Sequence, residues 1–298
     1  MARVLVTGGA GFIGHAIVGR LKAMGFEVTV ADLNPSRHAD VEQVTGDLLD
    51  PQVREKSLTP GTHAVIHLAA FTSVLKSLTD PYHVYDTNLK MTMDLLERSR
   101  QLGVRQFLLA SSNAVVGNVQ STAIHEDMIL RPLTPYGATK AGAEMLVTTY
   151  THAYGLLGAS LRMTNVYGTG MMHKDSMIPR LMRAALGHNA IQIYGDGEQV
   201  RDYIFLNDVA ESFITVLKQG FTGPLTVGFG RSVSVKALVQ LAEEATGHTI
   251  ATTHVSPKPG EMPAVVVDNS KLKHLGVTPQ TDLPEGLMQV WDDFKRLA

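Results

Sequence analysis

The sequence predicts an α/β protein with a doubly wound parallel sheet and a smaller C-terminal lobe. Three observations support this prediction. Short apolar runs alternate with helix-length stretches through the first half of the chain. A glycine-rich turn follows the first apolar run, and the alternation stops after Gly168, where loops rich in glycine and proline become frequent. Strands of a parallel sheet are typically short apolar runs because helices cover both faces of the sheet.

In the first half, predicted strands and helices alternate along the chain. Strands are predicted at Arg3–Val6, Glu27–Ala31, Val41–Thr45, Ala64–Leu68, Gln106–Ala110 and Ala159–Met163. Helices are predicted at Phe12–Met24, near Val53–Leu58, at Pro81–Leu102 and at Pro135–Tyr154. Right-handed crossovers place the carboxyl ends of such strands at one edge of the sheet, where ligands bind in this fold class. The residues that follow the strands are therefore expected to gather at that edge.

The second half contains fewer clear elements. Helices are predicted at Asp208–Lys218, Ser234–Thr246 and Leu283–Lys295, and a strand at Leu225–Val227. Ser234 or Ser232 suits the N-cap of the middle helix, and Gly247 suits its end. These shorter elements predict a lobe that closes over the carboxyl ends of the strands.

Composition limits the classes of function. The 298 residues are 44% apolar and 18% charged, with a net charge of −2, which is typical of one large or two modest globular domains. The chain has no basic stripe for nucleic acid and no apolar run of about 20 residues for a membrane. It has no cysteine, and its 12 histidines are scattered, so we expect neither a disulfide nor a metal site. The first strand begins at once, which argues against a signal peptide and for a cytoplasmic enzyme.

The turn after the first strand has the spacing of a dinucleotide-binding loop. Gly9, Gly11 and Gly14 fit G-x-G-x-x-G, and Gly8, Gly11 and Gly14 fit an overlapping G-x-x-G-x-x-G. Glycines at these positions permit a tight turn and a close approach of the backbone to a pyrophosphate. They also let the next helix lie against the strand with its amides and dipole facing the phosphates.

The choice between the two nicotinamide dinucleotides depends on the end of the second strand. Asp32 ends the apolar run that follows the first helix. A carboxylate there accepts both ribose hydroxyls and repels a 2′-phosphate, so the predicted cofactor is NAD, although Arg37 nearby is a signal for NADP. We expect a dinucleotide-binding domain over residues 1–167. Residues 168–298 are expected to form mainly a substrate-binding lobe, with part of them, about 200–230, returning to the first domain.

A second motif carries catalytic side chains. Pro135 suits the first turn of a helix, and the i, i+4 spacing puts Tyr136 and Lys140 on one face of it. A tyrosine with a pKa of about 10 is a poor base at neutral pH, but a nearby ammonium and an oxidised nicotinamide favour the phenolate. Tyr136 then removes a hydroxyl proton as hydride leaves the same carbon. Ser112, at the end of an earlier strand, is placed to hydrogen-bond the reacting oxygen.

These motifs together resemble those of the extended short-chain dehydrogenase/reductase superfamily, which has a Rossmann fold. The closest resemblance is to its NAD-dependent nucleotide-sugar epimerases, of the UDP-glucose 4-epimerase kind. The matching segments are Thr7–Gly14, Gly46–Leu48, His67–Ala70, Asn88, Ala110–Ser112, Thr134–Lys140, Leu161–Gly168, Ile193–Tyr203 and Lys258–Glu261.

The resemblance implies roles for individual residues. Ser112, Tyr136 and Lys140 match the catalytic triad. The implied cofactor-binding residues are Gly8, Gly11, Phe12, Ile13, Gly14, Asp32, Asn34, Asp47, Leu48, Leu68, Ala69, Ala70, Asn88, Tyr136 and Lys140. The implied substrate-binding residues are Ser112, Asn165, Tyr194, Arg201 and Lys258. Lys258 stands where galactose epimerases have an arginine, and it lacks the planar fork that matches a diphosphate, so the preference for uridine diphosphate stays open. For Asp202 we prefer the interpretation of a buried structural carboxylate.

The implied reaction is epimerisation of a nucleotide-diphosphate sugar, at C4, through a transient 4-keto sugar. Dehydratases of the family carry acidic residues just after the catalytic serine or threonine, whereas this chain has Asn113 and Ala114. A keto-sugar reductase or dehydrogenase with an exchangeable cofactor is the main alternative, and a non-catalytic dinucleotide sensor is another. The family also implies a homodimer through the predicted helices Pro81–Leu102 and Pro135–Tyr154.

Overall fold

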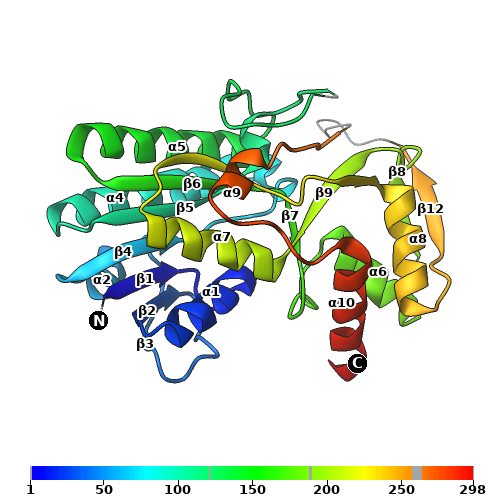
Figure 1. Cartoon of the computed structure of the whole chain (residues 1–298), viewed down its shortest axis with the longest axis horizontal. Coiled ribbons are helices and arrows are strands. Elements are labelled where there is room, and N and C mark those ends of the chain that lie inside the picture. Colours follow the sequence, from blue (N-terminus) through cyan, green and yellow to red (C-terminus); the bar gives the residue numbers. More distant parts are fainter. Residues whose placement is uncertain (1, 121, 188–189, 257–263, 298) are drawn as a thin grey trace.

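The computed structural model describes residues 2–120, 122–187, 190–256 and 264–297, and a seven-stranded parallel sheet forms its centre (Figure 1). The strand order is β10-β6-β5-β4-β1-β2-β3. Bounds are Arg3–Thr7 for β1, Glu27–Asp32 for β2, Glu42–Thr45 for β3, Thr62–His67 for β4, Gln106–Ser112 for β5, Leu157–Met163 for β6 and Gly223–Val227 for β10. The predicted fold class is confirmed. The order of the strands reverses between β1 and β4, the switch point where ligands bind in doubly wound folds.

Helices cover both faces of this sheet, and residue alternation in the strands explains why. Val4 and Val6 of β1 pack with α1 (Phe12–Ala23) and α7 (Leu206–Gln219). Leu5, between them, packs on the opposite face with α4 (Met91–Gln101) and α5 (Pro135–Tyr154). Side chains of a strand alternate between faces, so an apolar strand buries residues on both. Short α2 (Pro51–Ser57) lies beside β3.

The predicted helix Pro81–Leu102 is helical throughout but is not one regular α-helix. It consists of α3 (Pro81–Tyr85), a π-helical segment η2 (Asp86–Lys90) and α4. A π-helical turn inserts an extra residue and changes which side chains face inward, and such turns are frequent at functional sites. Here η2 turns Asn88 into the interior, where its side chain is 1% exposed.

The C-terminal lobe has its own core, made by α6 (Met177–Ala185), α8 (Val235–Thr246) and α10 (Leu283–Leu297). Ser234 caps α8 by accepting a hydrogen bond from the amide of Ala237 at 3.1 Å, and Gly247 ends it in the left-handed region, as predicted. Two small sheets complete the lobe. Their strands are β7 (Asn165–Tyr167), β9 (Val200–Phe205) and β11 (Ser232–Ser234) in one, and β8 (Ile191–Tyr194) and β12 (Thr252–Val255) in the other. Sequence analysis did not predict α6 or these strands.

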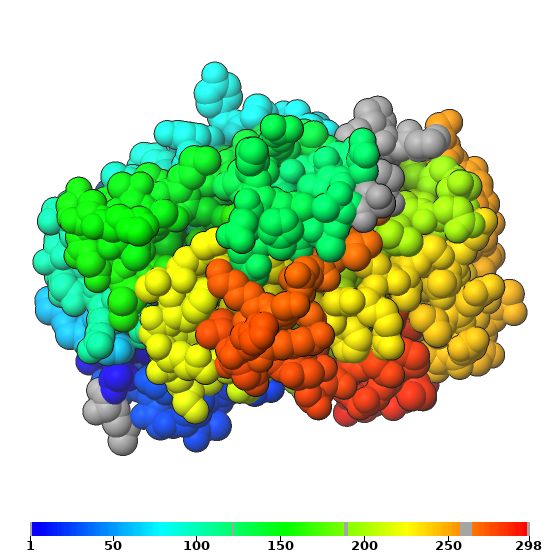
Figure 2. All heavy atoms as spheres, turned by 45° about the horizontal axis from the view of Figure 1, so that its top comes forward, coloured from blue at the N-terminus to red at the C-terminus, as the bar shows by residue number. Residues whose placement is uncertain are grey.

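Two segments return the chain from this lobe to the large sheet. The chain returns from β9 through α7 and β10, and β10 pairs with β6 at the edge of the large sheet. After β12, residues 264–269 run beside Ile124, whose amide donates to the carbonyl of Val266 at 2.8 Å. Short α9 (Ser270–His274) follows, and Figure 2 shows this orange segment lying against the yellow α7 region and the green segment above it.

Asp202, on β9, is buried at the junction of the two parts. It is fully buried and accepts hydrogen bonds from the Thr164 hydroxyl at 2.7 Å and from three consecutive backbone amides at residues 229–231. Burial raises the pKa of this carboxyl, and the four donors oppose that rise. These contacts support the interpretation of Asp202 as a structural carboxylate.

Candidate active site

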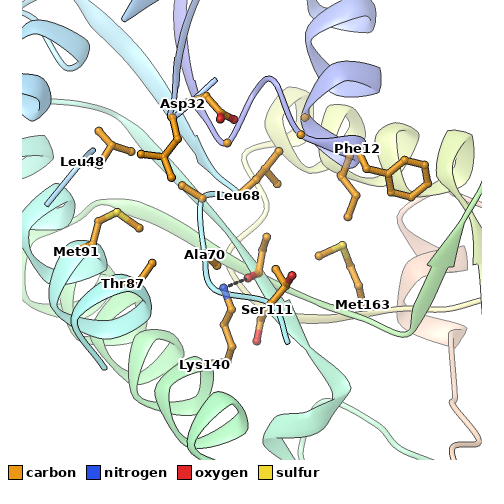
Figure 3. Close-up of a pocket in the computed structure, with 18 of the residues that line it drawn as sticks. Phe12, Asp32, Leu48, Leu68, Ala70, Thr87, Met91, Ser111, Lys140 and Met163 are labelled. Carbon is orange, nitrogen blue, oxygen red and sulfur yellow. Dashed lines mark hydrogen bonds between the residues drawn. The ribbon is translucent and has the colours of Figure 1, made fainter. Parts of the chain in front are cut away.

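A cleft of about 330 Å³ lies at the carboxyl ends of β1, β2, β4 and β5 (Figure 3). It is lined by Gly8, Gly11, Phe12, Ile13, Gly14, Asp32, Leu33, Gly46, Asp47, Leu48, Leu68, Ala69, Ala70, Thr72, Thr87, Met91, Ala110, Ser111, Tyr136, Lys140, Met163 and Lys174. All but two of the residues predicted to bind the cofactor are in this set, the exceptions being Asn34 and Asn88. Segments far apart in the sequence therefore meet where the strand pattern predicted.

The glycine turn brings the start of α1 against β1. A Cβ atom on Gly14 would lie 2.2 Å from the carbonyl oxygen of Gly8, so no larger residue fits there. The N-cap Gly11 provides no side-chain cap, and the first turn of α1 carries no acidic residue. The first amides of α1 and the positive end of its dipole are therefore available to an anion.

Asp32 is held next to this turn. One carboxylate oxygen accepts from the amide of Ala10 at 3.1 Å, and the other accepts from the amide of Asn34 at 3.0 Å. Asn34 thus contributes its backbone to the orientation of Asp32, while its side chain does not line the cleft. Asp47, from the loop after β3, lines the same end of the site and accepts from the amide of Leu49 at 2.9 Å.

We expect Asp32→Ala to weaken NAD binding about tenfold and to remove most of the discrimination against NADP, because the carboxylate that repels a 2′-phosphate is lost. Dissociation constants for both dinucleotides measure this. Asp127→Ala, at an exposed carboxylate, is the control. An unchanged ratio of the two constants would exclude Asp32 as the ribose ligand.

The catalytic motif lies at the inner end of the cleft. Tyr136 is in the first turn of α5, whose N-cap Thr134 accepts from the amide of Gly137 at 3.2 Å. Burial raises the pKa of Tyr136, and a hydrogen bond with the Ser112 hydroxyl opposes that rise. Ser112 ends β5 and accepts from the amide of Ala114 at 3.2 Å, which fixes its side chain beside the phenol.

Lys140 lies one turn further along α5. Its Nζ donates to the carbonyl of Ala110 at 2.9 Å, the hydrogen bond drawn in Figure 3. Burial lowers the pKa of Lys140 to about 8, with the carboxylate of Glu144 opposing the shift. The lysine is therefore still mostly an ammonium at neutral pH.

A buried chain of hydrogen bonds lies behind the cleft. His67 Nδ1 is 2.7 Å from the Thr7 hydroxyl, and its Nε2 is 3.0 Å from the Thr92 hydroxyl. Thr92 donates to the carbonyl of Asn88 at 2.6 Å, so it accepts from His67, which places the imidazole proton on Nε2. Burial, with the charge of Lys140, lowers the pKa of His67 to about 3, and the ring stays neutral.

Asn88 continues this chain instead of lining the cleft. Its carboxamide accepts from the amide of Phe71 at 2.7 Å and donates to the carbonyl of Phe71 at 3.0 Å and to the Thr139 hydroxyl at 3.2 Å. The prediction gave Asn88 a cofactor contact. These hydrogen bonds hold the loop after β4 against α5, and the cofactor contact of Asn88 stays a prediction.

A nicotinamide dinucleotide fits the donors that remain. The Thr87 hydroxyl lines the cleft and is buried without a hydrogen-bond partner in the described part of the chain. A buried polar atom is costly unless it is paired, and a bound molecule supplies the partner. The glycine turn, Asp32 and this hydroxyl would hold NAD, whose chemistry is the reversible acceptance of a hydride.

Three of the predicted substrate residues, Asn165, Tyr194 and Arg201, lie on the lobe, whereas Ser112 ends β5 of the large sheet. Asn165, on β7, donates to the carbonyl of Asp202 at 2.9 Å, and Arg201, on β9, donates to the carbonyl of Val200 at 2.9 Å. Neither these two nor Tyr194, on β8, is among the residues that line the cleft. Lys258 lies outside the described residues.

Several residues that line the cleft were not predicted. Met163 ends β6, so its position alone signals it. Ser111 is the next-to-last residue of β5, in a segment singled out above but without a predicted role, and its hydroxyl donates to Glu144. Thr87 lies on the π-helical segment, which residue periodicity does not reveal. Lys174 comes from the loop between β7 and α6, and no sequence pattern indicated it.

The described residues contain no group of three or more His, Cys, Asp or Glu side chains suited to a metal ion. Across the same residues, no helix has both the length and the apolar character needed to cross a bilayer.

Comparisons with known proteins agree with this geometry. Residues 4–228 match the sequence profile described as the NAD dependent epimerase/dehydratase family. The chain is 31% identical to the UDP-glucose 4-epimerase of Corynebacterium glutamicum over 312 residues, covering 97% of this chain and 94% of the relative. It is 32% identical to the UDP-glucuronate 4-epimerase of Thermodesulfobacterium geofontis, with 96% and 94% covered. The crystal structure of the Thermus thermophilus UDP-glucose 4-epimerase in complex with NAD superposes with a TM-score of 0.92 at 34% identity, covering 98% of this chain and 99% of that one.

Proposed function

The chain belongs to the NAD dependent epimerase/dehydratase family, and we propose that it is an NAD-dependent epimerase that inverts C4 of a UDP-sugar. One observation carries this proposal: Tyr136, which is hydrogen-bonded to Ser112, and Lys140 line the same cleft as the glycine turn and Asp32. A base beside the reacting end of a bound dinucleotide is the arrangement that a reversible oxidation of a hydroxyl requires.

Each side chain of the triad has a part in that reaction. Tyr136 takes the proton of the 4-hydroxyl as the C4–H bond breaks and the C4 carbonyl forms, and it returns the proton when hydride is added to the opposite face of C4. Ser112 donates a hydrogen bond to the oxygen, and Lys140 holds positive charge near the phenolate. Because hydride leaves and returns within one turnover, the reaction consumes no second substrate.

We expect kcat/KM to fall as the pH rises through about 8, because Lys140 then loses its proton and the phenolate of Tyr136 loses its neighbouring charge. The sign follows from the lysine being charged below its pKa and neutral above it. In Lys140→Arg, the guanidinium stays charged to above about pH 12. The decline of kcat/KM at alkaline pH should therefore be absent in this variant, even if its kcat/KM is lower than that of the wild type at every pH. An identical decline in that variant would assign it to another group.

Proton NMR in heavy water tests the reaction itself. The purified protein, with catalytic NAD, is given UDP-glucose, UDP-galactose, their N-acetyl and uronate forms, and dTDP- and GDP-hexoses. We expect one UDP-linked C4 pair to interconvert without solvent deuterium entering the sugar. Deuterium uptake would indicate enolisation at C3 or C5, and steady oxidation of NADPH with a keto sugar would indicate a reductase.

A homodimer through α3, α4 and α5 is part of the proposal. These helices carry large apolar side chains that are unusually exposed: Tyr82 is 83% exposed, Met93 40% and Tyr154 56%. The Tyr150 hydroxyl on α5 lies 3.8 Å from the sulfur of Met93 on α4, so these two helices pack against each other beside the exposed methionine. Exposed apolar side chains on adjacent helices suit association with a second copy.

We expect Met93→Glu to convert a dimer into a monomer in light scattering coupled to gel filtration, because an unpaired carboxylate would be buried at the interface. Met288→Glu, at a methionine that is 50% exposed on α10 of the other lobe, should leave the dimer intact. A monomeric wild-type protein would contradict the proposed dimer.

The proposed domains correspond to two separate hydrophobic cores. Residues 1–167, with about 200–230, are proposed to bind the dinucleotide, and the remainder of 168–298 is proposed to bind mainly the substrate. The separate core formed by α6, α8 and α10 supports this division. We also propose a cytoplasmic location, since a chain without cysteine gains nothing from an oxidising compartment. Cell fractionation tests this location.

A further inference from the structure

Lys174 reaches the cofactor cleft from the C-terminal lobe. It lies in the loop between β7 and α6, yet it lines the same cleft as the glycine turn. Its Nζ is 5.1 Å from the centre of the Phe12 ring. Phe12 is the first residue of α1 and packs against the core of the lobe, and Figure 3 shows it across the turn from Asp32. The ammonium is therefore beside the helix N-terminus that faces the cleft.

The loop that carries Lys174 is held in place by its own contacts. The amide of Lys174 donates to the carbonyl of Met171 at 2.9 Å, and Met171 is buried. Arg183, on α6, donates to the carbonyls of Met172 at 2.7 Å and Lys174 at 3.1 Å. When a ligand binds, a side chain on such a fixed loop loses less conformational entropy than a side chain on a loop without these contacts.

Among the described residues, no carboxylate forms a salt bridge with Lys174. The adjacent Asp175 pairs instead with Arg180 at 3.8 Å and Arg183 at 3.9 Å. The side chain as a whole is exposed at the mouth of the cleft, but burial around the ammonium lowers the pKa of Lys174. A partly desolvated cation beside a helix N-terminus favours a bound anion.

We propose that Lys174 binds the diphosphate of a nucleotide in the cleft, so that the C-terminal lobe helps to hold the ligand of the N-terminal sheet. Two nucleotides bring that group: the dinucleotide cofactor and the nucleotide-sugar substrate. The contact with Phe12 places the ammonium at the glycine turn, which favours the diphosphate of the cofactor. This inference rests on the proposed function, since it takes the cleft as the NAD site.

Calorimetric titration of nucleotide-free protein with ADP-ribose and, separately, with UDP tests the proposal. The proteins are the wild type, Lys174→Met, Lys174→Arg and the control Lys218→Met, whose lysine is exposed on α7. We expect Lys174→Met to weaken ADP-ribose binding about tenfold and to reduce its dependence on salt. Lys174→Arg should stay within about threefold of the wild type, because it keeps the charge, and Lys218→Met should match the wild type.

The two ligands separate the possible outcomes. A loss for ADP-ribose supports the cofactor as the source of the diphosphate, and a loss for UDP alone keeps the diphosphate contact but assigns it to the substrate. If Lys174→Met binds both ligands as tightly as the wild type, the proposal is overturned. It is also overturned if Lys174→Arg binds as weakly as Lys174→Met, or if Lys174→Met binds more weakly but with the same dependence on salt concentration. The wild-type titration reports on the proposed function separately: if that protein does not bind ADP-ribose, the NAD site itself is wrong.

Discussion

Replacing Tyr136 by phenylalanine is expected to lower kcat by about 10³-fold while the dissociation constant for NAD stays within about threefold. The substitution removes only the phenol oxygen, which is the proposed proton acceptor and hydrogen-bonds Ser112, and leaves the buried ring in place. Lys140 keeps its hydrogen bond to the carbonyl of Ala110, so the cleft retains its shape.

Turnover of the UDP-sugar identified by NMR, together with a titration of NAD, measures this effect. The matched control is Tyr154→Phe on the same helix, where the side chain is 56% exposed and far from the motif in sequence. It should leave kcat unchanged. Substantial activity in Tyr136→Phe would show that another group takes the proton.

Replacing Arg162 by methionine is expected to lower the free energy of unfolding by about 3–5 kcal/mol, because it leaves Glu144 charged and unpaired in the interior. The two side chains are 4% and 5% exposed. Arg162 Nη2 donates to Glu144 at 2.8 Å, and its Nη1 donates to the carbonyl of Glu126 at 2.9 Å. Glu144 is also one turn beyond Lys140 on α5, so the same pair supports the catalytic helix.

Urea unfolding measures this loss, and two variants make it specific. Arg100→Met breaks an exposed pair with Glu97 and should cost less than about 1 kcal/mol. Arg162→Met combined with Glu144→Leu removes both charges, so the double variant should be more stable than Arg162→Met alone. A loss of only about 1 kcal/mol for Arg162→Met would mean that Glu144 is protonated or hydrated once its partner is gone.

Most of the large sheet could be predicted because its signals are local. The strands β1, β2, β4, β5 and β6 are rich in buried apolar residues, and Thr134, Ser234 and Gly247 mark helix ends by their own chemistry. The small strands β8 and β12 could not be predicted, since exposed pairs such as Gln192 and Thr253 interrupt any continuous apolar run. Their pairing depends on a partner far away in the sequence.

The sequence by itself predicted most of the segments that line the cleft. Gly8 to Gly14, Asp32, and the pair Tyr136 and Lys140 act through short spacings, and the rule for parallel strands brings these segments to one edge. Only the tertiary structure shows that the carboxamide of Asn88 hydrogen-bonds Phe71 and Thr139 and that Lys174 lines the cleft. Both outcomes depend on how distant segments pack. A spacing in the sequence fixes which side chains share a turn or a face, but only packing fixes which of them meet across the fold.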